Sequence, residues 1–230
     1  MHPRFAERAL TPRYTFPEAG VVLHQSTQKL RRWALGHDRT YKERKAYDDP
    51  LIRIDGSPEP DGVPLSFLNL IELRFLSSYR IGASLPAIRR ALDYAAAQMH
   101  VDRPLLQLEF AVHGRELFLE YASGDGKQYF VNASRGGQLA WPQSLDFLMK
   151  SLDYDDVEHA AFRWWPLGKQ RPILLDTRLN AGLPSTAQSG IRTDIINLRL
   201  TQGWDRRSLE DDLAAQAGEI EAAVEFAEAA

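Results

Sequence analysis

The sequence predicts a mainly α-helical protein with small β elements, an α+β fold. Apolar residues recur at helical spacing near both ends of the chain, for example over 66–76, 84–95 and 218–227. Serine or aspartate stands before several of these segments, as expected of helix N-caps. In the middle, apolar and polar residues alternate over 105–112 and 115–122, which predicts a small antiparallel meander.

Length and composition allow a folded chain with more than one unit. At 230 residues, the chain can form one large domain or two to three small ones, at about 150 residues per domain. We divide it into residues 1–100, a connector over 101–170 and a small helical unit over 171–230. The 44% hydrophobic and 26% charged residues can bury a core, which excludes a wholly disordered or fibrous chain.

The sequence lacks the residues that several classes of protein function need. The chain has no cysteine, which excludes disulfides, thiolate catalysis, zinc ribbons and iron–sulfur clusters. It has no nucleophile elbow and no phosphate-binding glycine loop, so we expect neither an enzyme nor a cofactor. No apolar run approaches the roughly 18 residues of a membrane span, and the first residues lack a signal-peptide core. We therefore expect a soluble cytoplasmic protein.

Charge is divided unevenly along the chain. Residues 1–45 contain ten basic and four acidic side chains, a balance of +6, although the whole chain carries −3. Residues 204–230 contain eight acidic and two basic side chains, a balance of −6. A basic head and an acidic tail predict different partners for the two ends.

The basic head has the pattern of a helix-turn-helix. Thr15 and Glu18 have the spacing of a capping box and predict a short helix from there. After a tight turn, Ser26 caps a second helix over 27–35, and Gly36 ends it. Two short helices with a polar, basic second helix are typical of DNA-binding helix-turn-helix motifs.

The second helix of this motif has one apolar side and one polar side. Leu30 and Trp33 are three residues apart and face the same way. We expect the remaining side to contact the DNA major groove through Ser26, Thr27, Gln28, Lys29, Arg31 and Arg32. We expect phosphate contacts from the segment that follows, through Arg39, Tyr41, Lys42, Arg44 and Lys45.

A wing and two helices are predicted after the motif. The alternation over 51–54 and the Gly/Pro-rich stretch over 55–62 predict a two-stranded wing with a long tip. Ser66 and Ser84 are placed to cap the helices that follow.

Four segments of the head resemble MerR-type winged helix-turn-helix proteins. They are Tyr14–Ala19, Leu30–Trp33, Leu65–Leu73 and Ser84–Leu92, and the resemblance extends over about residues 12–100. It implies DNA binding as a homodimer on a two-fold operator. His24 departs from the pattern, because glycine is frequent there in the family.

The connector offers one candidate metal site. A helix is expected over 141–152, and Asp153, Asp155, Asp156, Glu158 and His159 follow it. Carboxylates of this kind can bind a hard metal ion, but loop carboxylates are usually solvated, and we expect no specific metal site here. The five tryptophans are expected to be core anchors.

The tail predicts a strand over 172–176 and three short helices, a helix-turn-helix-like bundle. Leu174–Asp176, Gly182–Pro184, Gly190–Thr193 and the helix over 220–226 resemble a VapB-like antitoxin family. The resemblance implies a type II antitoxin that neutralises a PIN-like ribonuclease toxin and represses its own operon.

The last helix is too acidic to enter a DNA groove. We therefore expect contacts with the toxin or a second copy from Glu219, Ile220, Glu221, Val224, Glu225 and Phe226. Deletion of residues 218–230 should then abolish neutralisation and spare operator binding.

Two other functions stay open at this point. The first is a stand-alone MerR-like transcription regulator that senses a small ligand through residues 101–170. The second is a metal-dependent enzyme that uses residues 153–159.

Overall fold

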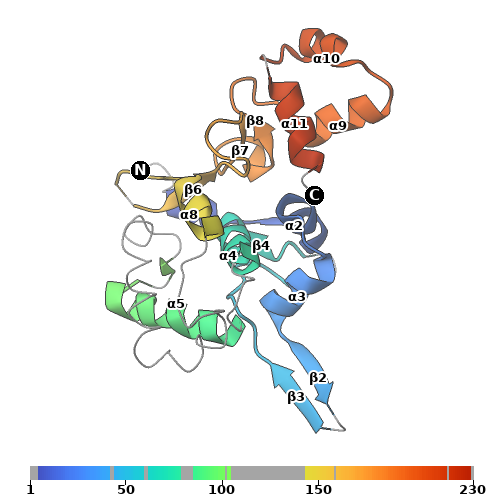
Figure 1. Cartoon of the computed structure of the whole chain (residues 1–230). Coiled ribbons are helices and arrows are strands. Elements are labelled where there is room, and N and C mark those ends of the chain that lie inside the picture. The colour runs from blue at the N-terminus through green and yellow to red at the C-terminus, as the bar shows by residue number, and fades with distance from the viewer. Residues whose placement is uncertain are drawn as a thin grey trace.

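The computed structural model describes most of the chain outside its middle. The described residues are 5–41, 44–59, 62–78, 85–101, 103–104, 143–157, 159–216 and 218–228. They form helices and small antiparallel sheets (Figure 1), which confirms the predicted α+β class. The meander predicted over 105–132 lies outside the described residues.

The first unit begins with α1 (Phe5–Leu10), β1 (Pro12–Tyr14), α2 (Phe16–Leu23) and α3 (Thr27–Leu35). A hairpin of β2 (His37–Tyr41) and β3 (Arg44–Asp48) follows. The short β4 (Leu65–Ser66) returns to pair antiparallel with β1. The helices α4 (Phe67–Ser78) and α5 (Leu85–Met99) complete the unit.

The second unit is a small sheet followed by helices. After α8 (Gln143–Lys150), the antiparallel sheet contains β5 (Leu152–Tyr154), β6 (Ala161–Trp164), β7 (Ile173–Asp176) and β8 (Ser185–Thr186) in that order. A 3₁₀ turn, η3 (Asn180–Gly182), precedes β8. The last helices are α9 (Thr193–Thr201), α10 (Arg206–Leu213) and α11 (Glu219–Glu228).

This sheet extends across the boundary that we expected between residues 170 and 171. β5 and β6 lie before the boundary, and β7 and β8 lie after it. The helix expected over 141–152 ends at Lys150, because Leu152 already belongs to β5. Among the described residues, no helix is long and apolar enough to cross a membrane.

α4 is the centre of the hydrophobic core. It contacts α1, α2 and α8 (Figure 1). Its apolar residues are buried on all sides, which is typical of a helix enclosed by its neighbours. They are Phe67, Leu68, Leu70, Ile71, Leu73, Phe75 and Leu76. Ser66 caps this helix as expected, because its hydroxyl accepts the Asn69 N–H at 3.1 Å.

One strand of the wing is not where the sequence predicts it. The hairpin is formed by residues 37–48, with a tip at 42–43 that lies outside the described residues. Residues 51–54, which we expected to form a strand, belong to none.

A buried asparagine explains this difference. Asn69 accepts the Asp55 N–H at 3.0 Å and donates to the Arg53 carbonyl at 2.7 Å, so a side chain replaces the strand partner. Arg103 then holds the Asp55 carboxylate with two bonds of 2.6 and 2.9 Å. The segment after the wing is thus fixed on α4 instead of forming a strand.

The two units are packed against each other at specific points. The buried Tyr14 hydroxyl of β1 donates to the Gly182 carbonyl at 2.6 Å, and burial raises the Tyr14 pKa, so the proton needed for this bond stays in place. Gly182 has φ +83°, and a Cβ there would stand 2.5 Å from the Tyr14 hydroxyl oxygen. Only glycine fits this contact.

Candidate nucleic-acid interface

α2 begins at the capping box that the sequence predicts. The Thr15 N–H donates to Glu18 Oε2 at 2.8 Å, and the Glu18 N–H donates to Thr15 Oγ1 at 3.4 Å. The helix ends at His24, which has φ 54° and ψ 45°, in the left-handed region. The chain therefore turns sharply after α2 and enters α3 three residues later.

Close packing fixes the angle between α2 and α3. Gly20 faces the turn, and a Cβ there would stand 3.0 Å from the Gln25 carbonyl oxygen and 3.3 Å from Thr27 Oγ1. A larger residue would push the two helices apart. Ser26 caps α3 by accepting the Lys29 N–H at 3.3 Å. The predicted helix-turn-helix is thus present over residues 16–35.

α3 has the two sides that its sequence predicts. Leu30, Trp33 and Ala34 are buried in the core. On the other side, Ser26, Gln28, Arg31 and Arg32 are exposed, while Thr27 and Lys29 are half-buried. The helix contains two arginines and a lysine but no acidic residue. Its outer side therefore offers amide, hydroxyl and guanidinium donors without a competing carboxylate.

Two of the three cations on α3 contact their own motif. Lys29 donates to Gln25 Oε1, and its ammonium nitrogen lies 4.6 Å from the centre of the Trp33 ring. The Arg31 guanidinium carbon lies 5.0 Å from the centre of the Phe16 ring. Gln28 and Arg32 have no side-chain partner within the part of the chain that the structure describes. These two residues are the most available to an incoming ligand.

Two hydrogen bonds hold the hairpin and the residues after it to the end of α3. The Tyr47 hydroxyl donates to the Leu35 carbonyl at 2.7 Å, and the Leu51 N–H donates to the Trp33 carbonyl at 2.7 Å. Gly36 joins α3 to β2 with φ +73°, and a Cβ there would lie 2.5 Å from the Asp48 carbonyl oxygen. The hairpin therefore cannot change its angle to α3 without breaking these contacts.

The wing residues expected to contact phosphates lie in this hairpin. Arg39 pairs with Ala46 in the strand register, Tyr41 with Arg44, and Thr40 with Lys45. Lys42, at the tip, lies outside the described residues. The hairpin extends away from the body of the protein directly after α3 (Figure 1). Two helices joined by a tight turn and followed by a projecting hairpin have the arrangement predicted for a winged helix-turn-helix.

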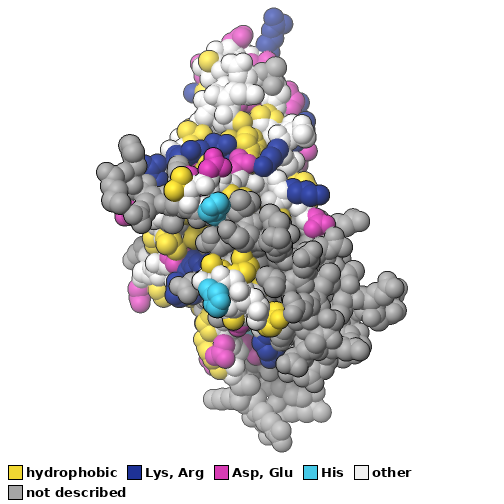
Figure 2. Space-filling model, turned by 90° about the vertical axis from the view of Figure 1, so that its left-hand side faces the viewer, with side chains coloured by type: hydrophobic (Ala, Val, Ile, Leu, Met, Phe, Trp, Pro, Cys, Tyr) yellow, Lys and Arg dark blue, Asp and Glu magenta, His cyan; other side chains and the backbone are white. Residues whose placement is uncertain are grey.

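In contrast to the cations of α3, the described basic side chains of the second unit are largely paired with acidic ones. Arg163 pairs with Asp176 at 2.8 Å and with Asp153 at 3.3 Å, and Lys169 pairs with Asp153 at 2.6 Å. Figure 2 shows basic and acidic side chains next to each other in the upper part of one face. No continuous basic patch is formed there by the described side chains.

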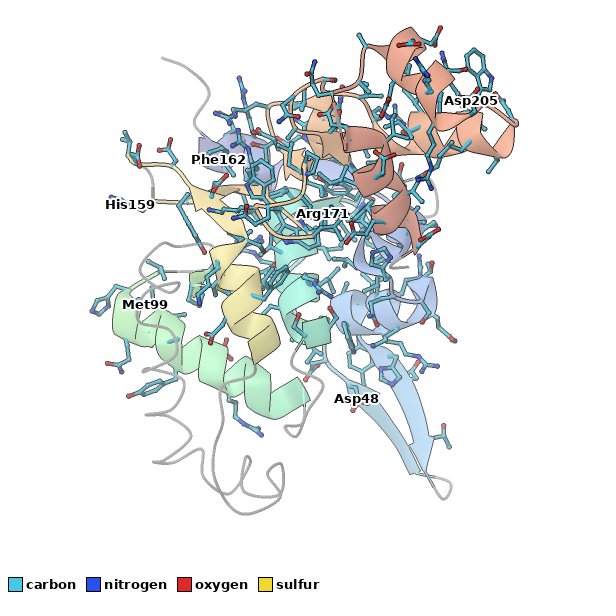
Figure 3. The ribbon with its side chains drawn as sticks, turned by 45° about the horizontal axis from the view of Figure 1, so that its top comes forward. Asp48, Met99, His159, Phe162, Arg171 and Asp205 are labelled. Carbon is cyan, nitrogen blue, oxygen red and sulfur yellow. The ribbon has the colours of Figure 1, made fainter. Side chains whose placement is uncertain are left out.

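The described residues of the candidate metal site do not come together as a group of metal ligands. Asp153 already accepts bonds from Lys169 and from the Trp165 indole N–H at 2.8 Å. Its pKa lies below its usual value, because these bonds and the nearby cations outweigh burial. No three His, Asp or Glu residues in the described segments could hold a metal ion, and Glu158 lies outside those segments. His159 lies at the outer edge of this region (Figure 3).

Half of the residues expected to contact a partner on α11 are buried inside the chain. Glu219 and Ile220 are 0% exposed, and Phe226 is 3% exposed. The Glu219 carboxylate accepts the N–H groups of Gln188, Ser189 and Gln216, which lower its pKa despite the opposing effect of burial. The prediction for these three side chains is therefore wrong: they hold α11 in the fold.

The other three residues of that prediction are partly exposed: Glu221, Val224 and Glu225. Glu225 pairs with Arg171, which lies beside α11 in Figure 3. Glu221 lies 3.8 Å from Arg206. Both acidic side chains thus interact within the unit.

Sequence reasoning missed a contact between α11 and the helix-turn-helix. The Phe226 and His24 rings meet edge to face, with their centres 5.5 Å apart. Burial, and then the charge of Arg74, lowers the His24 pKa, which favours the neutral ring. Nothing in the sequence around His24 indicates that its ring contacts Phe226, which is far away in the chain.

Comparison with known proteins supports the fold. No protein-family model and no curated protein matches the chain. The chain is similar to the crystal structure of Rv2018 from Mycobacterium tuberculosis. The two structures agree with a TM-score of 0.73 at 22% identity, over 93% of this chain and 98% of that one. The likeness extends over nearly the whole length of both chains, so the arrangement of both units recurs in another protein.

Proposed function

We propose that the protein is a DNA-binding antitoxin of a type II toxin–antitoxin system, which represses its own operon and neutralises a ribonuclease toxin of the PIN-like class. The observation that carries the DNA-binding part is the outer side of α3. It presents Gln28, Arg31 and Arg32 next to a hairpin fixed by Gly36 and Tyr47. Glutamine and arginine are suited to hydrogen bonds with base edges.

The charge distribution supports separate partners for the two ends. The head carries +6 over residues 1–45, which favours DNA phosphates. The tail carries −6 over residues 204–230, which favours an electropositive protein surface such as that of an RNA-cleaving enzyme. The resemblance of residues 172–228 to VapB-like antitoxins adds the toxin to the proposal. Such a protein would act in the cytoplasm without catalysis of its own.

One helix-turn-helix contacts only a short stretch of DNA. We therefore propose that a homodimer binds a palindromic operator, with one α3 in each half-site. The half-sites would be about one helical turn of DNA apart, or a multiple of it.

The first experiment is co-expression with the adjacent open reading frame. Expression of the neighbour alone should stop growth, and expression of this chain with it should restore growth. The two proteins should also co-purify. A harmless neighbour that does not bind would exclude the antitoxin function and leave a MerR-like regulator with a small ligand.

Operator binding is tested with two matched arginine variants. Arg32→Ala should weaken operator binding by about 1–3 kcal/mol if Arg32 contacts a base. Arg207→Ala removes an exposed arginine from α10 and should leave operator affinity unchanged. Equal effects of the two variants would indicate only a general loss of charge.

A further inference from the structure

Some apolar side chains of α9 are exposed and are not packed in the core. Ile196 is 0% exposed and anchors the helix, whereas Ile195 is 38% exposed and Leu198 is 57% exposed. Ile195 and Leu198 are three residues apart and therefore lie on the same side of the helix. Trp204 lies three residues after the end of α9 and is 42% exposed, contrary to its expected place in the core. Three large apolar residues are thus exposed within ten positions, where single ones are ordinary.

The Trp204 ring is held in place although it is not buried. The Arg199 guanidinium carbon lies 5.1 Å from the centre of this ring, and Arg199 also pairs with Asp212 of α10. The backbone N–H of Trp204 donates to the Arg199 carbonyl at 3.2 Å, which fixes the main chain of this residue. An aromatic side chain fixed at the surface loses little conformational freedom when a partner covers it, which is typical of binding anchors.

The charged side chains of the segment that carries these residues are mostly acidic. Three of the four arginines between 192 and 228 are paired, with Asp194, Asp212 and Glu221. Within the same described segment, Glu210, Asp211 and Glu228 have no cationic partner, and Arg207 has no acidic one. Exposed apolar residues on an acidic segment fit a partner that is apolar at the contact and electropositive near it.

From this combination we infer that Ile195, Leu198 and Trp204 form the surface that binds the toxin. We call it the α9 surface. The inference rests on the proposed function, because an enzyme that holds RNA must present positive charge near its cleft. It also replaces the earlier assignment to α11, whose apolar residues Ile220 and Phe226 are buried. α9 and α10 lie at one end of the chain in Figure 1, away from the β2–β3 hairpin.

The test replaces one apolar residue of the α9 surface by an acidic one. Leu198→Glu keeps a good helix former at a position that is 57% exposed, so the fold should tolerate it. Val157→Glu makes the same change at another exposed position, which is 86% exposed and lies outside α9. The full-length chain and both variants are co-expressed with the neighbouring open reading frame and then purified.

Leu198→Glu should weaken toxin binding at least tenfold and restore growth poorly, whereas Val157→Glu should behave like the wild type. Operator binding should be unchanged in both variants, which shows that they are folded. If Leu198→Glu does not fold, Trp204→Ala tests the same surface with a smaller change. Toxin binding by the wild type should also weaken as salt increases, because the rim charges are exposed.

The failures are distinguishable. A wild type that never binds or silences the neighbour overturns the proposed function itself. If the wild type neutralises the toxin, and Leu198→Glu and Trp204→Ala neutralise it equally well, only the α9 surface is overturned. If Leu198→Glu turns a free dimer into monomers in analytical ultracentrifugation, a second copy covers this surface and the inference is wrong.

Discussion

Replacing Phe226 with alanine should destabilise the protein by about 3–5 kcal/mol, the usual cost of removing a buried phenylalanine. Phe226 is 3% exposed, so nearly all of its ring is removed from water in the folded chain. Part of this energy comes from the edge-to-face contact with His24, at a distance of 5.5 Å between ring centres. Such aromatic pairs add about 0.5–1.5 kcal/mol beyond burial.

A double-mutant cycle isolates this contact. Phe226→Leu keeps apolar volume, and His24→Asn keeps a residue that tolerates the left-handed backbone at φ 54°. The two changes together should cost about 0.5–1.5 kcal/mol less than the sum of the single changes. Equilibrium urea unfolding, followed by tryptophan fluorescence, to which the buried Trp33 and Trp164 contribute, measures each free energy.

The control is Phe147→Ala on α8, where the side chain is 45% exposed and less energy should be lost. A coupling energy near zero, or an equal cost at positions 147 and 226, would refute the packing of α11 on the helix-turn-helix.

Deletion of residues 218–230 was expected to spare operator binding. The structure predicts the opposite, because the deletion removes Ile220 and Phe226 from the core.

Three further predictions concern stability and the wing. His24 has a lowered pKa in the folded chain, so the unfolded chain binds its proton more readily, and this contribution to stability should be lost as the pH decreases below about 6.5. Urea unfolding between pH 5.5 and 7.5 should show a larger loss of stability in the wild type than in His24→Asn. Gly36→Ala places a side chain in a backbone region reserved for glycine and should cost about 1–3 kcal/mol, with weaker operator binding in a gel-shift assay. Asn69→Ala leaves the N–H of the buried Ser66 without its acceptor, the Asn69 amide oxygen, and should cost about 1–3 kcal/mol in thermal unfolding.

Elements with local signals were predictable from the sequence. The capping box at Thr15 and the caps at Ser26 and Asp205 place the starts of α2, α3 and α10, because a cap depends on residues within one turn. The wing was misplaced because alternation over 51–54 cannot reveal Asn69, which satisfies that backbone from another element. The alternation predicts a strand there, whereas in the fold the backbone of this segment bonds to the Asn69 side chain.

The candidate site was predictable in outline only. Helical spacing separates Leu30 and Trp33 from the polar side of α3, and the structure confirms this division. Which cations are free depends on residues of other elements, such as Phe16 under Arg31. The same holds at α11, where Glu219 is buried because the loop at 188–189 supplies its donors. Tertiary contacts determine which side chains are free and which are buried, and a single segment of sequence does not show these contacts.

The positions of the two proposed surfaces have a consequence for regulation. The β2–β3 hairpin and α10 lie at opposite ends of the molecule in Figure 1, and again in Figure 3, where Asp205 marks the start of α10. A protein bound at the α9 surface would therefore not compete for space with DNA bound at α3 and the hairpin of the same chain. Any effect of the toxin on operator binding must then pass through the packed contacts between the units, such as Tyr14 with Gly182 and His24 with Phe226. A variant such as Phe226→Leu should change that effect without touching either surface.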